Sequence, residues 1–244
     1  MEASRMRRFW DARAREDAFH FVDSREPYND ADAERFWRNG ERDLDTFLGA
    51  LGVTVRQDDV VLDIGCGLGR LTRVLARRSA HVIGLDVSPE MLRRAQELNA
   101  NLNNVTWLLG DGESLTGVDD ASLDGAVSHV VFQHIPDPKV TLGYVAELGR
   151  VLKPGAWAAI GLSTDPTIHE PPPPEERGTS RRALLRGLVG REPRGTGAPE
   201  WLGAPVPLEA LGAVATEAGL VLEDIEGAGT QFTFVRAVRG SRGA

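Results

Sequence analysis

Cysteine is almost absent from this sequence of 244 residues, which contains only Cys66. A single cysteine cannot form an internal disulfide, so a reducing compartment is expected. Long apolar runs are lacking too, because no stretch of about 18 apolar residues is present, which predicts no membrane span. The first 17 residues contain no apolar core of the kind found in secretory signal peptides. These absences predict a cytoplasmic protein.

Positive charge is outnumbered by negative charge. Lys and Arg number 28 against 36 Asp and Glu, which gives a formal net charge of -8 and a pI of about 5.2. Nucleic-acid binding depends on neutralising phosphates, so we expect no nucleic-acid partner. Six arginines between residues 177 and 194 are a local exception, which we interpret as a solvated segment. Cysteines and histidines show no metal-ligand spacing, so no metal is expected.

From residue 59 onward, apolar segments alternate with amphipathic ones. Segments typical of strands begin near Val60, His81, Val105, Leu123 and Ala156. Between them, helical spacing predicts helices over residues 68–77 and 89–100, and a third from Pro138 that ends before the sequence Lys153-Pro154-Gly155. Ser88 and Asp137 are placed to cap the second and third helices. Strands that alternate with helices predict an α/β fold around a parallel sheet.

The two ends of the chain depart from this alternation. We predict four parts: a helical N-terminal cap of two helices at residues 1–50, a core at 51–163, a proline- and arginine-rich excursion at 164–206 that covers the site, and a last helix with a C-terminal hairpin at 207–244. A weak helix is expected at 181–189. The final two strands are separated by too few residues for a parallel crossover, so they should be antiparallel.

A glycine-rich turn follows the first strand, in the sequence VVLDIGCGLGRLTRVLARR at residues 60–78. A dinucleotide fingerprint would need a third glycine at the position of Arg70. A phosphate-binding P-loop would need a lysine, and no lysine lies nearby. The turn is therefore expected to hold a ligand other than a pyrophosphate.

Three carboxylates follow the first three strands. Asp63 stands two residues before Gly65, where it would repel a phosphate and suit a ligand that carries an ammonium and a sulfonium. Asp86 ends the second strand, where a carboxylate can accept from both ribose hydroxyls, although NAD would use the same device. Asp111 follows the third strand, where it could accept from an adenine amino group or cap its own loop.

Five segments, taken in chain order, resemble the successive motifs of class I S-adenosylmethionine-dependent methyltransferases. They are VLDIGCGLG, GLDVSPEML, GDGESL, LDGAVSHVVFQHIPDP and ELGRVLKPGAWAAI. The resemblance covers residues 58–163 and is nearest to small-molecule enzymes related to ubiquinone and menaquinone methyltransferases. It implies a Rossmann-like, seven-stranded, mostly parallel sheet with a reversed C-terminal strand, and S-adenosyl-L-methionine as cofactor.

The resemblance also implies cofactor-binding positions. They are Asp63, Gly65, Cys66, Gly67, Asp86, Val87, Met91, Asp111, Gly112 and Ser128. Among them Asp63 would hold the methionine end, Asp86 the ribose hydroxyls and Asp111 the adenine edge. Cys66 is interpreted as a small residue of the turn and not as a nucleophile.

The implied activity is in-line methyl transfer to a small-molecule acceptor, for example an aromatic compound or a natural product. His129 and His134 flank the end of the fourth strand and are the candidate catalytic bases; the alternative is that positioning alone suffices. Candidate substrate contacts are Phe21, Tyr28, Trp37 and His169. Two further alternatives stay open, a methyltransferase of peptide, protein or RNA and a non-catalytic cofactor-binding protein. A homodimer also stays open.

Overall fold

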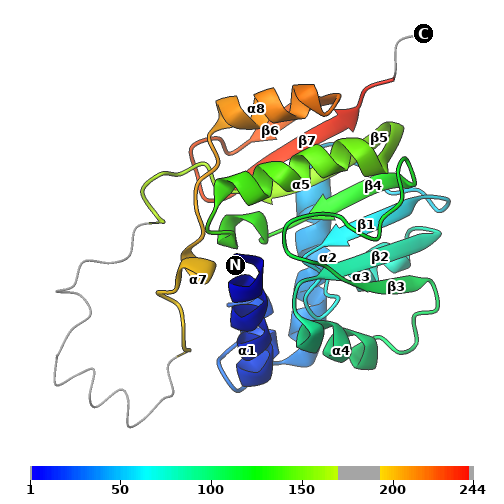
Figure 1. Ribbon diagram of the computed structural model, residues 1–244. Helices are drawn as coiled ribbons and strands as arrows, with labels where there is room; N and C mark the ends of the chain where they lie inside the picture. The colour runs from blue at the N-terminus through cyan, green and yellow to red at the C-terminus, as the bar shows by residue number, and fades with distance from the viewer. Residues whose placement is uncertain (1, 170–192, 242–244) are drawn as a thin grey trace.

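The computed structural model describes residues 2–169 and 193–241, and these form a seven-stranded sheet with helices on both faces (Figure 1). The strands are β1 (Val60–Ile64), β2 (His81–Asp86), β3 (Val105–Leu109), β4 (Leu123–Ser128), β5 (Leu152–Leu162), β6 (Leu220–Glu226) and β7 (Thr233–Arg239). Their spatial order is β3-β2-β1-β4-β5-β7-β6. The order reverses direction at β1 and β4, which places a crevice at the carboxyl ends of these two strands.

All pairs from β3 to β5 are parallel, whereas β7 is antiparallel to both β5 and β6. The short link between β6 and β7 enforces this reversal, because a parallel connection needs a crossover of a dozen or more residues. The predicted α/β sheet with one reversed C-terminal strand is therefore confirmed.

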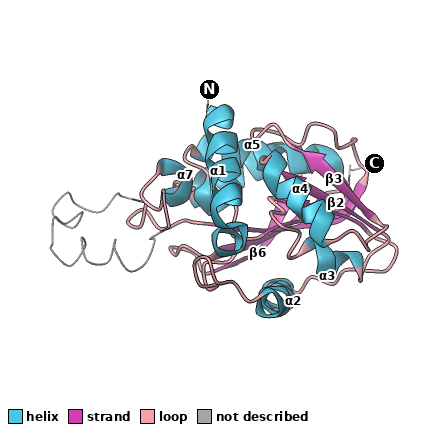
Figure 2. Cartoon of the chain, turned by 90° about the horizontal axis from the view of Figure 1, so that it is seen from below, coloured by secondary structure: helices cyan, strands magenta, loops and turns pink. Residues whose placement is uncertain are grey.

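The described helices cover both faces of the sheet. They are α1 (Glu2–Val22), α2 (Ala33–Ala50), α3 (Thr72–Ala76), α4 (Pro89–Leu98), the 3₁₀ turn η1 (Phe132–His134), α5 (Pro138–Val151), α7 (Pro199–Leu202) and α8 (Leu208–Glu217). In Figure 2, α2 and α3 lie on one side of the sheet and α5 on the other. Helices α5 and α8 pack against each other, and α4 packs against α1.

The caps predicted for α4 and α5 are present. The Ser88 hydroxyl accepts from the backbone N–H of Met91, and the Asp137 carboxylate accepts from that of Lys139. Each helix has proline in its first turn, where the missing N–H costs nothing. These local signals fix where both helices begin.

The helix predicted over residues 68–77 is shorter in the structure, where α3 covers only Thr72–Ala76. The reason is Gly69, whose φ of +80° lies outside the right-handed helical region. The chain therefore continues the glycine turn to Leu71 before the helix begins. All three glycines of the turn, at positions 65, 67 and 69, have positive φ, a conformation that residues with a side chain rarely adopt.

The fifth strand begins earlier than the predicted Ala156, at Leu152. Leu152 pairs with Leu123, but the next matched pair is Trp157 with Gly125, so residues 153–156 form an irregular insertion in the ladder. Gly155, at φ +79°, allows this bend. The third helix does end before Lys153, as predicted.

Two helices occupy the N-terminal region, as expected. Helix α2 belongs to the core, since Leu44, Phe47 and Leu48 pack with buried residues of β1 and α3. Helix α1 crosses the carboxyl ends of the strands. Its buried Asp11 accepts from the Ser88 hydroxyl and the Glu90 N–H at the start of α4, so α1 is held directly over the end of β2.

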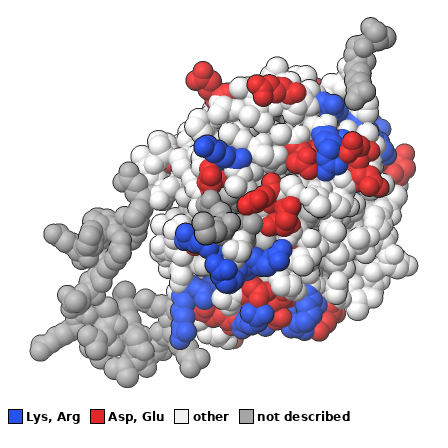
Figure 3. Space-filling model, in the orientation of Figure 1, with Lys and Arg blue, Asp and Glu red and all other residues white. Residues whose placement is uncertain are grey.

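Acidic and basic side chains of the described residues lie intermixed on the face drawn in Figure 3. Arg93 of α4 forms ion pairs with Glu90 and Glu97 of the same helix. Among the described helices, none is long and apolar enough to cross a bilayer. Most of the arginine-rich stretch and the weak helix expected at 181–189 fall outside the described residues.

Candidate functional site

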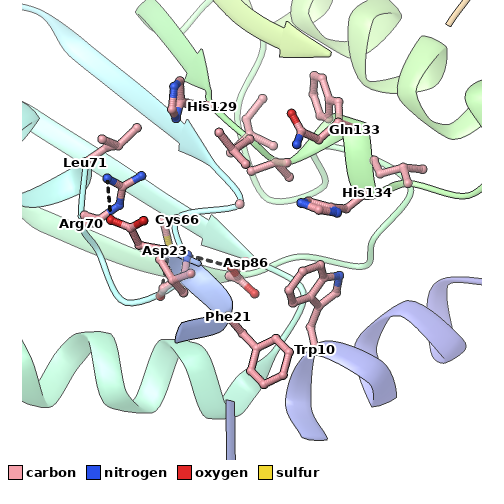
Figure 4. Close-up of a pocket in the computed structure, with 18 of the residues that line it drawn as sticks. Trp10, Phe21, Asp23, Cys66, Arg70, Leu71, Asp86, His129, Gln133 and His134 are labelled. Carbon is pink, nitrogen blue, oxygen red and sulfur yellow. Dashed lines mark hydrogen bonds and ion pairs between the residues drawn. The ribbon is translucent and has the colours of Figure 1, made fainter. Parts of the chain in front are cut away.

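A cavity of about 700 Å³ opens at the carboxyl ends of β1, β2 and β4 (Figure 4). Its floor is the glycine turn after β1, and its walls come from α1, α2, η1, α7 and the β6–β7 turn. This is the crevice where the strand order reverses, the usual ligand site of open α/β sheets. The size suits a nucleoside-sized ligand with a second small molecule beside it.

The glycine turn is held tightly against β2. The backbone N–H groups of Gly65 and Cys66 both donate to the Leu85 carbonyl, at 2.7 and 3.0 Å. A Cβ added at Gly65 would lie 2.5 Å from the side chain of Val131, and one at Gly67 would lie 2.9 Å from that of Val22. These glycines therefore admit the close approach of η1 and α1 to the turn, which closes the cavity around it.

Asp63 and Asp86 lie beneath the turn as two buried carboxyls lining the cavity. Asp63 accepts from the Thr72 hydroxyl at 2.6 Å, and Asp86 accepts from the N–H groups of Gly67 and Ser88, both at 2.8 Å. Burial raises the pKa of each to about 6, and the charge of Asp86 contributes to the shift at Asp63. A cationic ligand in the cavity would favour their ionised forms.

These pKa values predict that ligand affinity depends on pH. If the ligand binds only when a carboxyl with a pKa of about 6 is ionised, the competent fraction at pH 5 is about one tenth. We therefore expect the dissociation constant of S-adenosylhomocysteine, which carries an ammonium and ribose hydroxyls, to rise about tenfold from pH 7.5 to pH 5 by calorimetry. In Asp63→Asn the dependence should weaken. Equal affinity at both pH values in the wild-type protein would contradict this assignment.

The side of the cavity assigned to the adenine is lined by Val87, Met91 and Gly112. Asp111 does not line the cavity. Its carboxylate accepts instead from the N–H groups of Glu113 and Ser114 and from the Ser114 hydroxyl. Burial alone would raise the pKa of Asp111, but these hydrogen bonds bring it below its usual value. The structure thus favours the loop-capping alternative over the adenine contact.

Cys66 lines the cavity, whereas Ser128 lies beneath its surface. The Ser128 hydroxyl donates to the Ile64 carbonyl at 3.3 Å and so joins β4 to β1. Burial raises the pKa of the Cys66 thiol well above its usual range, which disfavours the thiolate that a nucleophile would need.

His129 follows β4 and lines the cavity between Phe47 and Phe234, with ring centroids 5.0 and 6.1 Å away. Its Nδ1 is buried without a hydrogen-bond partner among the described residues. Burial, and then the charge of Arg70, lower its pKa to about 4. The ring is therefore neutral near pH 7 and has an unused polar atom, which suits hydrogen bonding to a ligand more than strong base catalysis.

His134 ends η1 and lines the opposite side of the cavity. Its ring lies among Trp10 and Trp201, at centroid distances of 5.5 and 5.2 Å. Burial lowers its pKa, so it too is neutral at pH 7. Both candidate bases thus face the cavity from the two ends of one segment, residues 129–134.

Of the four predicted substrate contacts, only Phe21 lines the cavity. The Tyr28 hydroxyl donates to Glu16 in a separate surface hollow. Trp37 lies outside the cavity with the Arg73 guanidinium stacked 3.7 Å from its ring centroid. His169 also lies outside, hydrogen-bonded to Leu202 and Ser163.

A cluster of four charged residues in the cavity wall was not predicted. Arg70, which follows the glycine turn, pairs with Asp43 of α2; Arg25 pairs with Asp43 and with Asp23. All four line the cavity, and they join the link between α1 and α2 to the turn. The only sequence signal was the density of charge around residues 23–25.

Residues 62–160 match the model of a known protein family, which is described as "Methyltransferase domain". A demethylmenaquinone methyltransferase of Tropheryma whipplei is 36% identical over 105 residues, 43% of this chain and 41% of that protein. A ubiquinone biosynthesis O-methyltransferase of Paracidovorax citrulli is 31% identical over 153 residues, 59% of this chain and 57% of that protein. The chain thus spans about half the length of the curated relatives it matches.

Solved structures show the same fold. A SAM-dependent methyltransferase of Methanosarcina mazei superposes with a TM-score of 0.56 at 23% identity, over 78% of this chain and 97% of that one. Residues 62–160 thus match a methyltransferase domain, and the chain has the fold of SAM-dependent methyltransferases of known structure.

Proposed function

We propose that this protein transfers the methyl group of S-adenosyl-L-methionine to a small acceptor with an aromatic or apolar body. The observation that carries the proposal is the continuity of one cavity, which runs from the acidic glycine turn to a wall of aromatic side chains. The turn offers what a cationic nucleoside needs, and the wall offers what an apolar acceptor needs.

The residues around the turn fit the cofactor by their chemistry. Asp63 and Asp86 are carboxyls at the cavity floor, suited to an ammonium and to ribose hydroxyls. Val87 and Met91 give the apolar surface on which an adenine would stack. When bound, the cofactor supplies an electrophilic methyl carbon; the role left to the protein is to hold the acceptor in line with it and to exclude water.

The acceptor is assigned to the aromatic part of the cavity. Trp10, Phe21 and Trp201 stand on one side, and Phe47 and Phe234 stand on the other. Rings of this kind bury a large area and hold planar groups in defined orientations. Two relatives are named for methylation in menaquinone and ubiquinone pathways, which supports a ring-bearing acceptor. Helix α1, the first part of the predicted N-terminal cap at residues 1–50, would close over it.

Neutral histidines at both ends of the segment 129–134 suit an acceptor that carries a hydroxyl or amine hydrogen. Each can accept a hydrogen bond from a hydroxyl or amine, and their pKa values keep them uncharged near pH 7. A positive charge beside the sulfonium would repel it, so neutral rings are compatible with the cofactor.

The test is an acceptor screen with mass detection. Purified protein and S-adenosyl-L-methionine are incubated with a panel of phenols, hydroquinones, aromatic acids and amines, and with peptide and RNA panels. Methylated product from the small-molecule panel alone is expected. Product only from peptide or RNA would overturn the acceptor assignment, and cofactor binding without product in any panel would favour a non-catalytic binding protein.

A further inference from the structure

Helix α7 is a single helical turn that packs against η1 and α1. Figures 1 and 2 show it beside α1. The ring of Trp201 contacts those of His134, Phe21 and Trp10 at centroid distances of 5.2, 5.7 and 6.2 Å. The neighbouring Glu200 is buried and pairs with Arg5 of α1 at 3.1 Å. Helix α7 is thus fixed beside the cavity by packing and by charge.

The backbone of α7 also determines which nitrogen of His134 carries the proton. Nδ1 of His134 lies 2.6 Å from the carbonyl oxygen of Trp201. A carbonyl oxygen only accepts, so Nδ1 must donate, and in the neutral ring Nε2 keeps a free lone pair. Figure 4 shows the ring extending from η1 into the cavity. No hydrogen bond to Nε2 is found within the described parts of the chain.

A second histidine holds the next carbonyl of α7 in the same way. Nδ1 of His169 donates to the Leu202 carbonyl, and its Nε2 lies 2.7 Å from the Ser163 hydroxyl. The N–H of Val206 donates to the Ser163 carbonyl at 2.8 Å. His169 therefore ties α7 to the end of β5, and both of its ring nitrogens are engaged.

The close approach of α7 to η1 requires glycine at position 203. Gly203 ends α7 with φ +65°, and a Cβ there would lie 1.9 Å from the carbonyl oxygen of Gln133 and 2.9 Å from Cα of His134. Both neighbours are backbone atoms, which cannot move aside as a flexible side chain can. Any larger residue must push α7 away from η1, and with it the Trp201 carbonyl from His134.

We propose that α7 is the positioning element of the active site: the Trp201 carbonyl, held against η1 by Gly203, fixes His134 as the Nδ1–H tautomer so that Nε2 takes the proton of the methyl acceptor. This inference rests on the proposed methyl transfer and selects acceptors with an exchangeable proton, such as phenols, acids or amines. The acceptor atom bonds to the methyl carbon, the carbon–sulfur bond breaks with its electron pair left on sulfur, and the acceptor's proton passes to Nε2 and then to solvent.

The tautomer is measured by ¹⁵N NMR of histidine-labelled protein at pH 7.5, a readout that needs no acceptor. The chain has five histidines, and the His134 signals are assigned by their loss in His134→Gln. The wild-type protein should show a protonated Nδ1 and an unprotonated Nε2 at His134. In Gly203→Ala the Nδ1–H signal should be lost and a proton should appear on Nε2, because the carbonyl partner has moved.

Two alanine variants serve as matched controls. Gly197→Ala lies in the same segment with open space around its Cβ, and Gly155→Ala carries the strain of positive φ, also with open space. Both should keep the wild-type His134 signals. Thermal shift by S-adenosylhomocysteine should persist in all three glycine variants, since none of these positions lines the cavity.

A proton on Nε2 of His134 in the wild-type protein would overturn the proposal, whether or not Gly203→Ala folds. An unchanged Nδ1–H signal in folded Gly203→Ala would overturn the role of Gly203. If instead the wild-type protein shows the expected tautomer but S-adenosylhomocysteine produces no thermal shift, the proposed methyl transfer fails and the positioning of His134 by α7 stands.

Discussion

Replacing Asp43 with alanine is expected to lower the free energy of unfolding by about 3 kcal/mol, because it leaves a buried guanidinium without its partner. Asp43 of α2 pairs with Arg70, whose side chain is only 7% exposed, and with Arg25. The Asp23 carboxylate is 3.9 Å from Arg70 and already receives hydrogen bonds from Arg25 and Asn39, so it cannot fully replace Asp43.

The matched control lies two residues further along the same helix. Asp45 pairs with Arg78, and these side chains are 53% and 34% exposed. A pair so open to solvent contributes at most about 1 kcal/mol. Urea unfolding followed by circular dichroism should therefore separate Asp43→Ala from Asp45→Ala by about 2 kcal/mol. Equal unfolding free energies in the two variants would show that the cluster does not hold α2 to the glycine turn.

Replacing Asp86 with alanine should raise the dissociation constant of S-adenosylhomocysteine tenfold or more, which corresponds to about 1.4 kcal/mol. The side chain ends β2 at the cavity floor and has an oxygen engaged by Gly67 and another by Ser88. The substitution removes the proposed acceptor of the ribose hydroxyls and also leaves the Gly67 N–H without its partner. Both effects weaken the site.

Asp86→Asn separates these two effects, since the amide keeps an oxygen and nearly the same shape but has no charge. Calorimetry should place its dissociation constant between those of the wild-type protein and Asp86→Ala. Thermal unfolding without ligand checks that each variant is folded. Wild-type affinity in both variants would reject the assignment of Asp86 to the ribose.

The sequence alone predicts those parts of the fold that depend on interactions between neighbouring residues. Ser88 and Asp137 cap the helices that they precede, and the order of strands and helices follows from periodicity. The glycine turn was also located correctly. The length of α3 was overestimated because apolar spacing continues through Gly69, whereas its positive φ delays the helix.

Parts of the site that depend on distant contacts could not be read from the sequence. Arg70 meets Asp43 across 27 positions of the chain, and Trp201 meets His134 across 67. The sequence gives no signal that separates the aromatic residues of the N-terminal helices from one another. In the structure, Phe21 lines the cavity, whereas Trp37 lies outside it and stacks with Arg73. Only the packing of α1 and α2 against the sheet decides between these faces.

The most direct measurement of the central claim is calorimetric titration of the wild-type protein with S-adenosylhomocysteine and, separately, with NAD at pH 7.5. The claim is that the turn after β1, with Asp63 and Asp86 beneath it, holds a cationic nucleoside and no pyrophosphate. One molecule of S-adenosylhomocysteine should bind per chain, and NAD should give no binding heat. Saturable binding of NAD with none of S-adenosylhomocysteine would contradict it.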